Sequence, residues 1–561
     1  LVIVWSLGNE KADGPNFTAA YKWIKDFDST RATHWERAGK GDNTDIFCPM
    51  YMEPDECAKY CEDPANTKPL IQCEYNHTMG NSGGGLKEYW DLIRKYPNYQ
   101  GGYDWDFVDQ ALHRHPNFKA SRTLADYDAI AAKYEPGTGT IPPEYCYGGD
   151  YNKKDASDNN FNCNGIIGPD RQLNPHAYEL AYQYQNIWAE PMDVANGKIS
   201  VYNENFFRDL SNYRLVWTVV EDGKTIKNGT VEDLNVEPQQ RANLDLGYQI
   251  APQGETMLNV EFQLKEAEPL MRAGQTVAYR QMPFRQNGNV KPSGLAEGKE
   301  SGKLKISNKK DEPSIKITGK GFEMAFNKQT GLLERYVAGE TPMLGEGGTL
   351  KPTFWRAVTD NDMGAGLQKK CSAWRDPQMN LTQITAEKKE SGAKVSAIYD
   401  MPQVKATLTL TYDIDPEGVI TVGESLKTTA GADVAAPLRF GMVMQLPYAM
   451  DKSVYYGRGP IENYPDRKDF ANVGIYEQTA DQQFFPYIRP QETGTKCDIR
   501  WWKQTDASGK GVRIEPGQDG KYLMASALHY SISELDDGDE KDQRHAVELK
   551  KSPFTELIIG S

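Results

Sequence analysis

Two hydrophobic patterns follow one another along this chain of 561 residues. From residue 1 to about 185, short apolar runs alternate with longer segments, 16–28 and 85–96 among them, whose apolar residues recur at helical spacing. This alternation is typical of βα repeats in a parallel sheet, and it predicts an α/β domain. The runs predicted to be strands are LVIVWSL (1–7), ATHWE (32–36), DIFCPMY (45–51), PLIQCEY (69–75) and GGYDWDFV (101–108).

Beyond about residue 186 the pattern changes to apolar and polar residues in alternation, which is typical of strands with one buried face. KISVYNENFF and YRLVWTVVEDGKTIKNGTV are examples, and their Asp-Gly and Asn-Gly pairs predict turns. A stretch rich in Gly, Lys and Ser, 287–303, predicts a linker or polar loop. We therefore expect β-sandwich domains over 186–288 and 289–561.

Composition narrows the class of protein. Hydrophobic residues make up 39% of the chain, as in a globular protein, and the formal net charge is −15. A negative chain does not attract nucleic acid or anionic lipid, because both select clustered Lys and Arg. No apolar run approaches the roughly 20 residues of a membrane-spanning helix. We expect neither a nucleic-acid nor a membrane partner.

The eight cysteines are too sparse for a disulfide framework, so we expect free thiols. The sequence starts without Met and without the basic region of a signal peptide, so it leaves a cytoplasmic and a periplasmic location both open.

Candidate chemistry begins with two glutamates that follow predicted strands, Glu10 in WSLGNE and Glu74 in IQCEY. If the βα repeats form a (β/α)8 barrel, the carboxyl ends of all strands meet at one mouth, where distant residues face each other. A retaining glycosidase needs two carboxyl groups about 5–5.5 Å apart, whereas an inverting enzyme holds them further apart. A single Glu after a strand is more often a capping or solvated group. Asn9 favours the glycosidase, because its amide can reach a sugar hydroxyl beside Glu10.

Eight segments, in order, resemble the large multidomain β-galactosidases of glycoside hydrolase family 2. They are VIVWSLGNE, TDIFCPMY, PLIQCEYNHTMGNS, QGGYDWDFVDQ, YGGDY, FNCNG, FWRAVTDNDMG and YYGRGPIENYPDRKDFANVGIY. The resemblance implies strands 4 to 8 of a TIM barrel over 1–185 and an Ig-like β-sandwich over 186–288. It implies a large, galactose-mutarotase-like β-sandwich over 289–561. The last two segments favour galactosidases over the shorter glucuronidases and mannosidases of the family.

The resemblance also implies roles for individual residues. Glu10 would be the acid/base and a Mg²⁺ ligand, Glu74 the nucleophile, and Tyr51 a hydroxyl donor to that nucleophile. The residues implied to bind substrate are Asn9, His77, Trp105 and Asn164. Simpler alternatives are a buried barrel Tyr51, a His77 bonded only to backbone, and a Trp105 that fills the core rather than packing against galactose.

A second metal site is implied for Na⁺ or K⁺. Its ligands would be the carbonyl oxygen of Phe161 and the side-chain oxygen of Asn164, which are the oxygen donors that such cations prefer. Further magnesium ligands, three barrel strands and a substrate loop of the family have no counterpart between Leu1 and Ser561. We therefore expect a chain truncated at both ends that does not catalyse alone.

The implied activity is hydrolysis of terminal non-reducing β-D-galactose from β-galactosides such as lactose, through a covalent galactosyl-enzyme, by a homodimer or homotetramer. Two alternatives stay open. The same machinery can act on a β-glucuronide or a β-mannoside, although we find no Asn-x-Lys motif for a glucuronide carboxylate. The chain can also be a carbohydrate-binding protein with an inactive barrel.

Overall fold

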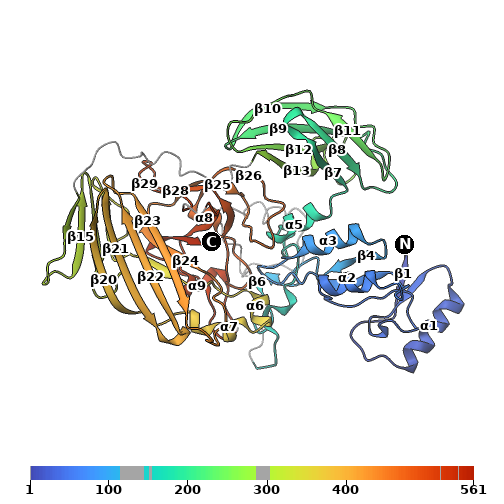
Figure 1. The fold of residues 1–561 in the computed structure, drawn as a ribbon. Coiled ribbons are helices and arrows are strands. Elements are labelled where there is room, and N and C mark those ends of the chain that lie inside the picture. Colours follow the sequence, from blue (N-terminus) through green and yellow to red (C-terminus); the bar gives the residue numbers. More distant parts are fainter. Residues whose placement is uncertain are drawn as a thin grey trace. The chain divides into compact units, whose positions relative to one another are not determined.

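The computed structural model describes residues 2–113, 145–150, 154–285, 304–517, 520–540 and 543–560. The described residues up to Gln183 form one compact unit, and those from Tyr184 onward form a second (Figure 1). The predicted linker at 287–303 lies outside the described residues.

The first unit is built on parallel strands. The strands are β1 (Val4–Ser6), β2 (Ala32–His34), β3 (Leu70–Tyr75) and β4 (Tyr99–Asp104). β1 pairs in parallel with β2, and β3 pairs in parallel with β4. A short antiparallel pair, β5 (Leu112–His113) and β6 (Tyr145–Cys146), follows them.

The segment 45–51 joins these two pairs. The Asp45 N–H donates to the Thr33 carbonyl oxygen at 2.8 Å, and a parallel bridge links Met50 to Glu74. The five runs predicted to be strands therefore lie side by side in sequence order, and their carboxyl ends share one edge. The α/β prediction for this region is confirmed.

Helices connect the strands. They are α1 (Pro15–Phe27), α2 (Pro54–Glu62), α3 (Leu86–Lys95) and α5 (His176–Gln183). Proline begins both α1 and α2, at a position where its missing N–H would have no helical partner. Cys57 and Tyr60 of α2 are buried with Leu70 and Tyr99 of the strands, and α3 packs against the same cluster. The helices predicted at 16–28 and 85–96 are confirmed by α1 and α3.

The second unit begins with a sandwich of antiparallel strands. One sheet has the order β10 (Lys224–Val231), β9 (Tyr213–Glu221), β12 (Thr256–Leu264) and β13 (Thr276–Arg285). The other has the order β11 (Arg241–Asp245), β8 (Lys198–Asn203) and β7 (Ile187–Asp193). Alternate residues of both sheets, such as Val201 and Phe262, are buried in one common core. The period-two pattern beyond residue 186 therefore predicted this region correctly.

One of the two turn signals in this sandwich was wrong. Asp222 and Gly223 form the turn between β9 and β10, with φ of 49° and 78°. Asn228 and Gly229, also predicted to turn, lie inside β10 instead. Gly229 pairs with Trp217, and a Cβ at Gly229 would lie 2.5 Å from the tryptophan ring. Close cross-strand packing, rather than a turn, requires glycine at that position.

Residues 304–560 form further sheets around a second large core. The largest sheet has the order β14 (Lys305–Ser307), β15 (Ser314–Gly319), β16 (Phe322–Asn327), β17 (Leu333–Ala338), β19 (Leu350–Thr353), β24 (Gly441–Pro447), β31 (Phe554–Gly560), β30 (Leu523–Leu528) and β27 (Lys496–Ile499), with β18 (Thr341–Pro342) beside β17. A second sheet is β20 (Asn380–Lys389), β21 (Gly392–Met401), β22 (Ala406–Ile414) and β23 (Ile420–Thr428). A third is β26 (Val473–Thr479), β25 (Lys452–Arg458), β28 (Trp501–Thr505) and β29 (Gly511–Ile514). Short helices lie in the loops between these strands: α6 (Asp360–Gly364), α7 (Leu367–Lys370), α8 (Ala480–Gln483) and α9 (Ile532–Leu535).

A buried ion pair ties the two sandwiches of the second unit together. Arg500 donates from Nη2 to Glu255 Oε1 at 2.7 Å and from Nε to Oε2 at 3.0 Å. Their side chains are only 5% and 3% exposed. The Tyr279 hydroxyl adds a hydrogen bond of 2.8 Å to the Phe470 carbonyl oxygen. Such a bidentate pair fixes geometry as well as contributing energy.

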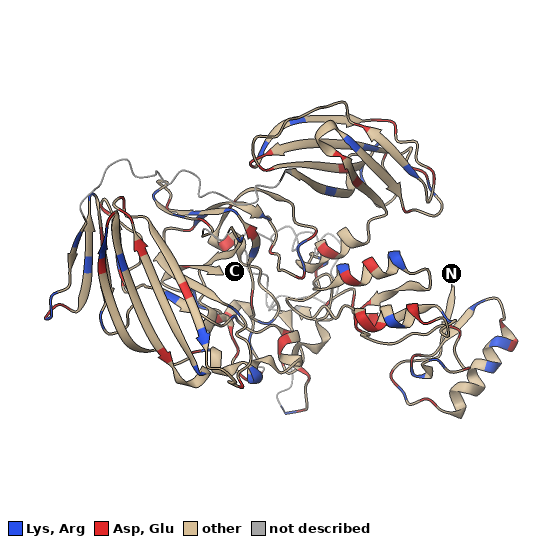
Figure 2. Cartoon of the chain, viewed as in Figure 1, with Lys and Arg blue, Asp and Glu red and all other residues tan. Residues whose placement is uncertain are grey.

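Acidic and basic residues are interspersed along both units (Figure 2). Among the helices that the structure describes, none is both long and apolar enough to span a membrane. All eight cysteines are free thiols, as predicted.

Candidate active site

The carboxyl ends of the parallel strands bring several predicted site residues together. The Tyr51 N–H donates to the Glu74 carbonyl oxygen at 2.8 Å, and the Tyr51 hydroxyl donates to Glu74 Oε2 at 2.8 Å. The sequence placed these two residues on neighbouring strands, and the structure joins their side chains directly.

Three residues at this edge have an uncommon backbone conformation. Glu10, Tyr51 and Asn76 have φ of 51°, 48° and 50°. The left-handed region is unfavourable for residues other than glycine and costs on the order of 1–3 kcal/mol for each. Such residues concentrate at functional sites, and here each one follows the end of a parallel strand segment.

The Tyr51 hydroxyl is held in its protonated form. Burial raises the pKa of Tyr51 well above its usual value, and the hydrogen bond to Glu74 adds to the effect. The negative charges of Glu74, Glu10 and Asp104 raise this pKa further. Tyr51 is therefore a permanent hydrogen-bond donor to the Glu74 carboxylate.

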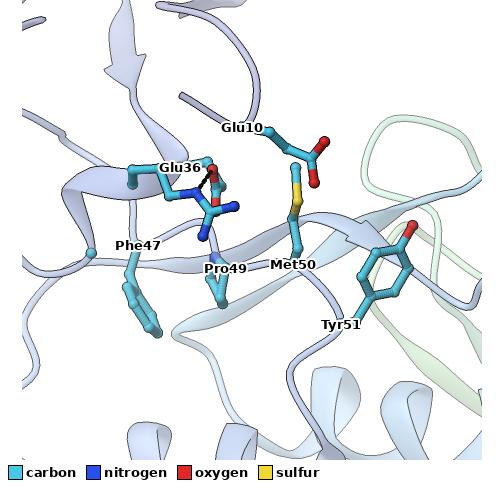
Figure 3. A pocket seen from close by; sticks show the side chains of 8 residues that line it. Glu10, Glu36, Phe47, Pro49, Met50 and Tyr51 are labelled. Atoms are coloured by element: carbon cyan, nitrogen blue, oxygen red, sulfur yellow. Dashed lines mark ion pairs between the residues drawn. The ribbon is translucent and has the colours of Figure 1, made fainter. Parts of the chain in front are cut away.

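A pocket of about 450 Å³ opens beside these residues (Figure 3). Its lining residues are Glu10, Glu36, Arg37, Gly39, Phe47, Pro49, Met50 and Tyr51. Glu10 and Tyr51 both line it, with Met50 between them in the view of Figure 3. Because the Tyr51 hydroxyl is hydrogen-bonded to Glu74, both predicted catalytic carboxylates, Glu10 and Glu74, lie at this edge of the parallel strands.

Glu36 was not predicted as a site residue. It begins the short 3-10 helix Glu36–Ala38 and forms an ion pair of 3.0 Å with Arg37. Burial raises the pKa of Glu36, Arg37 opposes this, and the charges of Glu10 and Glu74 raise it further. The negative charges of Glu10 and Glu74 therefore both act on the Glu36 carboxyl group. The available signal was that the run ATHWE also ends on a glutamate.

His77 lies beside Tyr51, with ring centroids 5.8 Å apart in an edge-to-face arrangement. The His77 ring also lies near the Phe161 ring, with centroids 5.7 Å apart. Trp105 follows β4 and is partly exposed. Its backbone N–H donates to the Tyr75 carbonyl oxygen at 3.2 Å. Asn9 is exposed directly before Glu10. The structure thus gathers Tyr51, Glu74 and His77 most closely.

The predicted sodium ligands lie next to each other. Asn164 Nδ2 donates to the Phe161 carbonyl oxygen at 2.6 Å, while Asn164 Oδ1 is buried and has no hydrogen-bond partner among the described residues. Asp106 Oδ1 is likewise buried without a hydrogen-bond partner among the described residues. The Asp106 backbone N–H donates to the Asn164 carbonyl oxygen. Buried oxygens without donors fit a hard monovalent cation.

The described residues fit magnesium less well. They contain no group of three or more His, Cys, Asp or Glu side chains arranged to hold a metal ion. The acidic neighbour of Glu10, Glu36, is already paired with Arg37. Magnesium binding at Glu10 therefore stays a prediction.

Three family models match the chain. Residues 1–189 match "Glycosyl hydrolases family 2, TIM barrel domain", residues 199–285 match "Beta-galactosidase, domain 4", and residues 318–560 match "Beta galactosidase small chain".

Curated relatives match over nearly the whole chain. A β-galactosidase of Priestia megaterium is 33% identical over 95% of this chain and 49% of its own length. A β-galactosidase of Yersinia enterocolitica is 32% identical over 95% of this chain and 51% of its own length. One of Lactobacillus delbrueckii subsp. bulgaricus is 31% identical over 98% of this chain and 50% of its own length. The chain thus spans about half the length of these relatives.

The parallel strands with carboxylates at one edge, followed by β-sandwich domains, define a TIM-barrel protein of the glycoside hydrolase class. The chain belongs to glycosyl hydrolase family 2. Its second unit has the domains of the β-galactosidase group of that family.

Proposed function

We propose that this protein acts as a retaining β-galactosidase, which releases terminal β-D-galactose from β-galactosides such as lactose. The observation that carries the proposal is the Tyr51–Glu74 hydrogen bond of 2.8 Å beside a pocket lined by Glu10. The β-galactosidases among the relatives support galactose as the sugar.

In the first step, Glu74 attacks the anomeric carbon while Glu10 gives its proton to the leaving oxygen. The bond from the anomeric carbon to the leaving oxygen breaks, and a galactosyl ester of Glu74 forms. In the second step, Glu10 takes a proton from water, the water oxygen attacks the anomeric carbon, and Glu74 leaves as a carboxylate. Two inversions give net retention.

The other residues would orient these groups. Tyr51 keeps one oxygen of Glu74 engaged, so that the other is directed to the sugar. His77 and Asn9 would contact sugar hydroxyls, and the Trp105 ring would pack against the apolar face of galactose. A bound Na⁺ or K⁺, held by Phe161 and Asn164, would supply positive charge that attracts a sugar oxygen. No step is assigned to magnesium.

The test uses the complete gene product and a panel of aryl β-glycosides that includes galactoside, glucuronide and mannoside. We expect cleavage of the galactoside, with the β-anomer of galactose formed first in the NMR spectrum. E74Q should lower turnover at least 10³-fold, with folding unchanged by circular dichroism. A first product of α configuration would refute retention, and preference for a glucuronide or mannoside would refute the sugar assignment.

A further inference from the structure

A third carboxyl group stands beside the proposed nucleophile and has no part in the mechanism above. Asp104 ends β4, and the register of the parallel pair puts it opposite Tyr75, which follows Glu74. Asp104 Oδ2 accepts a hydrogen bond of 2.6 Å from Asn76 Nδ2. The Thr78 hydroxyl lies 3.3 Å from Asp104 Oδ1 but donates its single proton to the nearer Asn164 carbonyl oxygen, at 2.5 Å. Asp104 therefore holds the loop that follows the nucleophile through the Asn76 amide, and Thr78 lies next to its other oxygen.

This loop needs such anchoring. Asn76 has a φ of 50°, so the chain turns through an unfavourable conformation two residues after Glu74. Thr78 is also fixed to the segment after β4, because its N–H donates to the Trp105 carbonyl oxygen at 2.9 Å. Asp104 and the Trp105 carbonyl group thus hold the loop at both sides of His77.

The environment of Asp104 is negative and partly buried. Burial raises the pKa of Asp104 to about 7, Asn76 and Thr78 lower it, and the charge of Asp106 raises it. Asp104 in turn contributes to the raised pKa of Tyr51, together with Glu74 and Glu10. The charged group that acts on Asp104 is thus Asp106 on its own segment, and Asp104 acts on Tyr51.

We propose that Asp104 is a positioning residue: it fastens the Asn76–Thr78 loop to the end of β4 and thereby fixes the Glu74 carboxylate against the Tyr51 hydroxyl. The proposal rests on the proposed function, in which Glu74 attacks the sugar. The hydrogen bond from the Asn76 amide to Asp104 joins the loop after Glu74 to the end of β4.

Two variants of the complete gene product separate position from charge. D104A removes the acceptor of the Asn76 amide, and we expect kcat to fall about 10- to 100-fold with KM changed less than threefold, because a misplaced nucleophile slows chemistry more than binding. D104N keeps the shape and one acceptor, and we expect its kcat at pH 6 to stay within threefold of the parent protein. The control is D91N on α3, whose exposed carboxylate pairs with Lys87, and it should match the parent protein.

The split between kcat and KM, together with rescue by D104N, gives a readout that loss of packing would not move. A D104A variant with kcat within twofold of the parent would overturn the proposal. An increase in KM alone would also overturn it, because it would make Asp104 a substrate contact. So would a D104N variant whose kcat falls as far as that of D104A.

Failure of the proposed function would be recognised separately. All ratios are measured on whichever aryl β-glycoside the parent protein cleaves best. If that substrate is not a galactoside, the sugar assignment fails, while the comparison of D104A, D104N and D91N still decides the role of Asp104.

Discussion

The hydrogen bond from Tyr51 to Glu74 gives the sharpest test of the proposed mechanism. Tyr51→Phe removes one hydroxyl and leaves the ring. The donor is neutral, the acceptor is a carboxylate, and the two oxygens are 2.8 Å apart. Hydrogen bonds to charged groups contribute about 1.5–3 kcal/mol. Because the Tyr51 side chain is 38% exposed, water can partly replace the hydroxyl, which favours the lower half of that range.

A loss of about 1.5–2 kcal/mol corresponds to roughly a 10- to 30-fold lower kcat/KM. The assay is hydrolysis of aryl β-galactosides by the complete gene product and by Y51F. We expect a similar loss for good and poor leaving groups, because Tyr51 holds the nucleophile whereas Glu10 protonates the leaving oxygen. A matched control is Y448F, which removes the hydroxyl of a tyrosine that is 42% exposed in the second unit. The reasoning is refuted if Y51F keeps kcat/KM within twofold of the parent protein.

Three further predictions concern other parts of the chain. Burial raises the pKa of Glu424 to about 8, so its carboxyl group is protonated in the fold at low pH, and stability falls as pH rises from about 4.5 to 8. E424Q should therefore stabilise the chain by on the order of 2 kcal/mol in urea unfolding at pH 9 and by almost nothing at pH 4, and an equal gain at both would contradict this. R500A should cost about 3–5 kcal/mol in the same assay because it leaves Glu255 buried and unpaired, and a loss below about 1 kcal/mol would count against the pair. N164A should abolish stimulation of galactoside cleavage by Na⁺, and unchanged stimulation in a titration with NaCl would exclude Asn164 as a ligand.

The parallel strands could be predicted because their sequence signal is local. Runs such as PLIQCEY are short and mostly apolar and are followed by polar residues, and β3 lies where the run predicts it. The helix α2 escaped prediction because it is short and mostly polar, so its periodicity was weak beside the neighbouring runs. The Asn228–Gly229 pair misled for another reason: its glycine is required by a tryptophan on the adjacent strand, and such a contact is invisible in a local window.

The residues of the candidate site also fall into those that the sequence could predict and those that it could not. Glu10, Tyr51 and Glu74 carry a signal because strand ends converge in a parallel sheet, so position in the sequence translates into position in space. Their neighbours Glu36 and Asp104 depend on burial and on which side chain meets which. The sequence shows Asp104 only as one acid in GGYDWDF, whereas the structure shows it hydrogen-bonded to Asn76 of the loop after Glu74. Roles that follow from topology can thus be predicted from the sequence, while roles that follow from a hydrogen-bond network need coordinates. Substitutions at Asp104 therefore test more than the family resemblance.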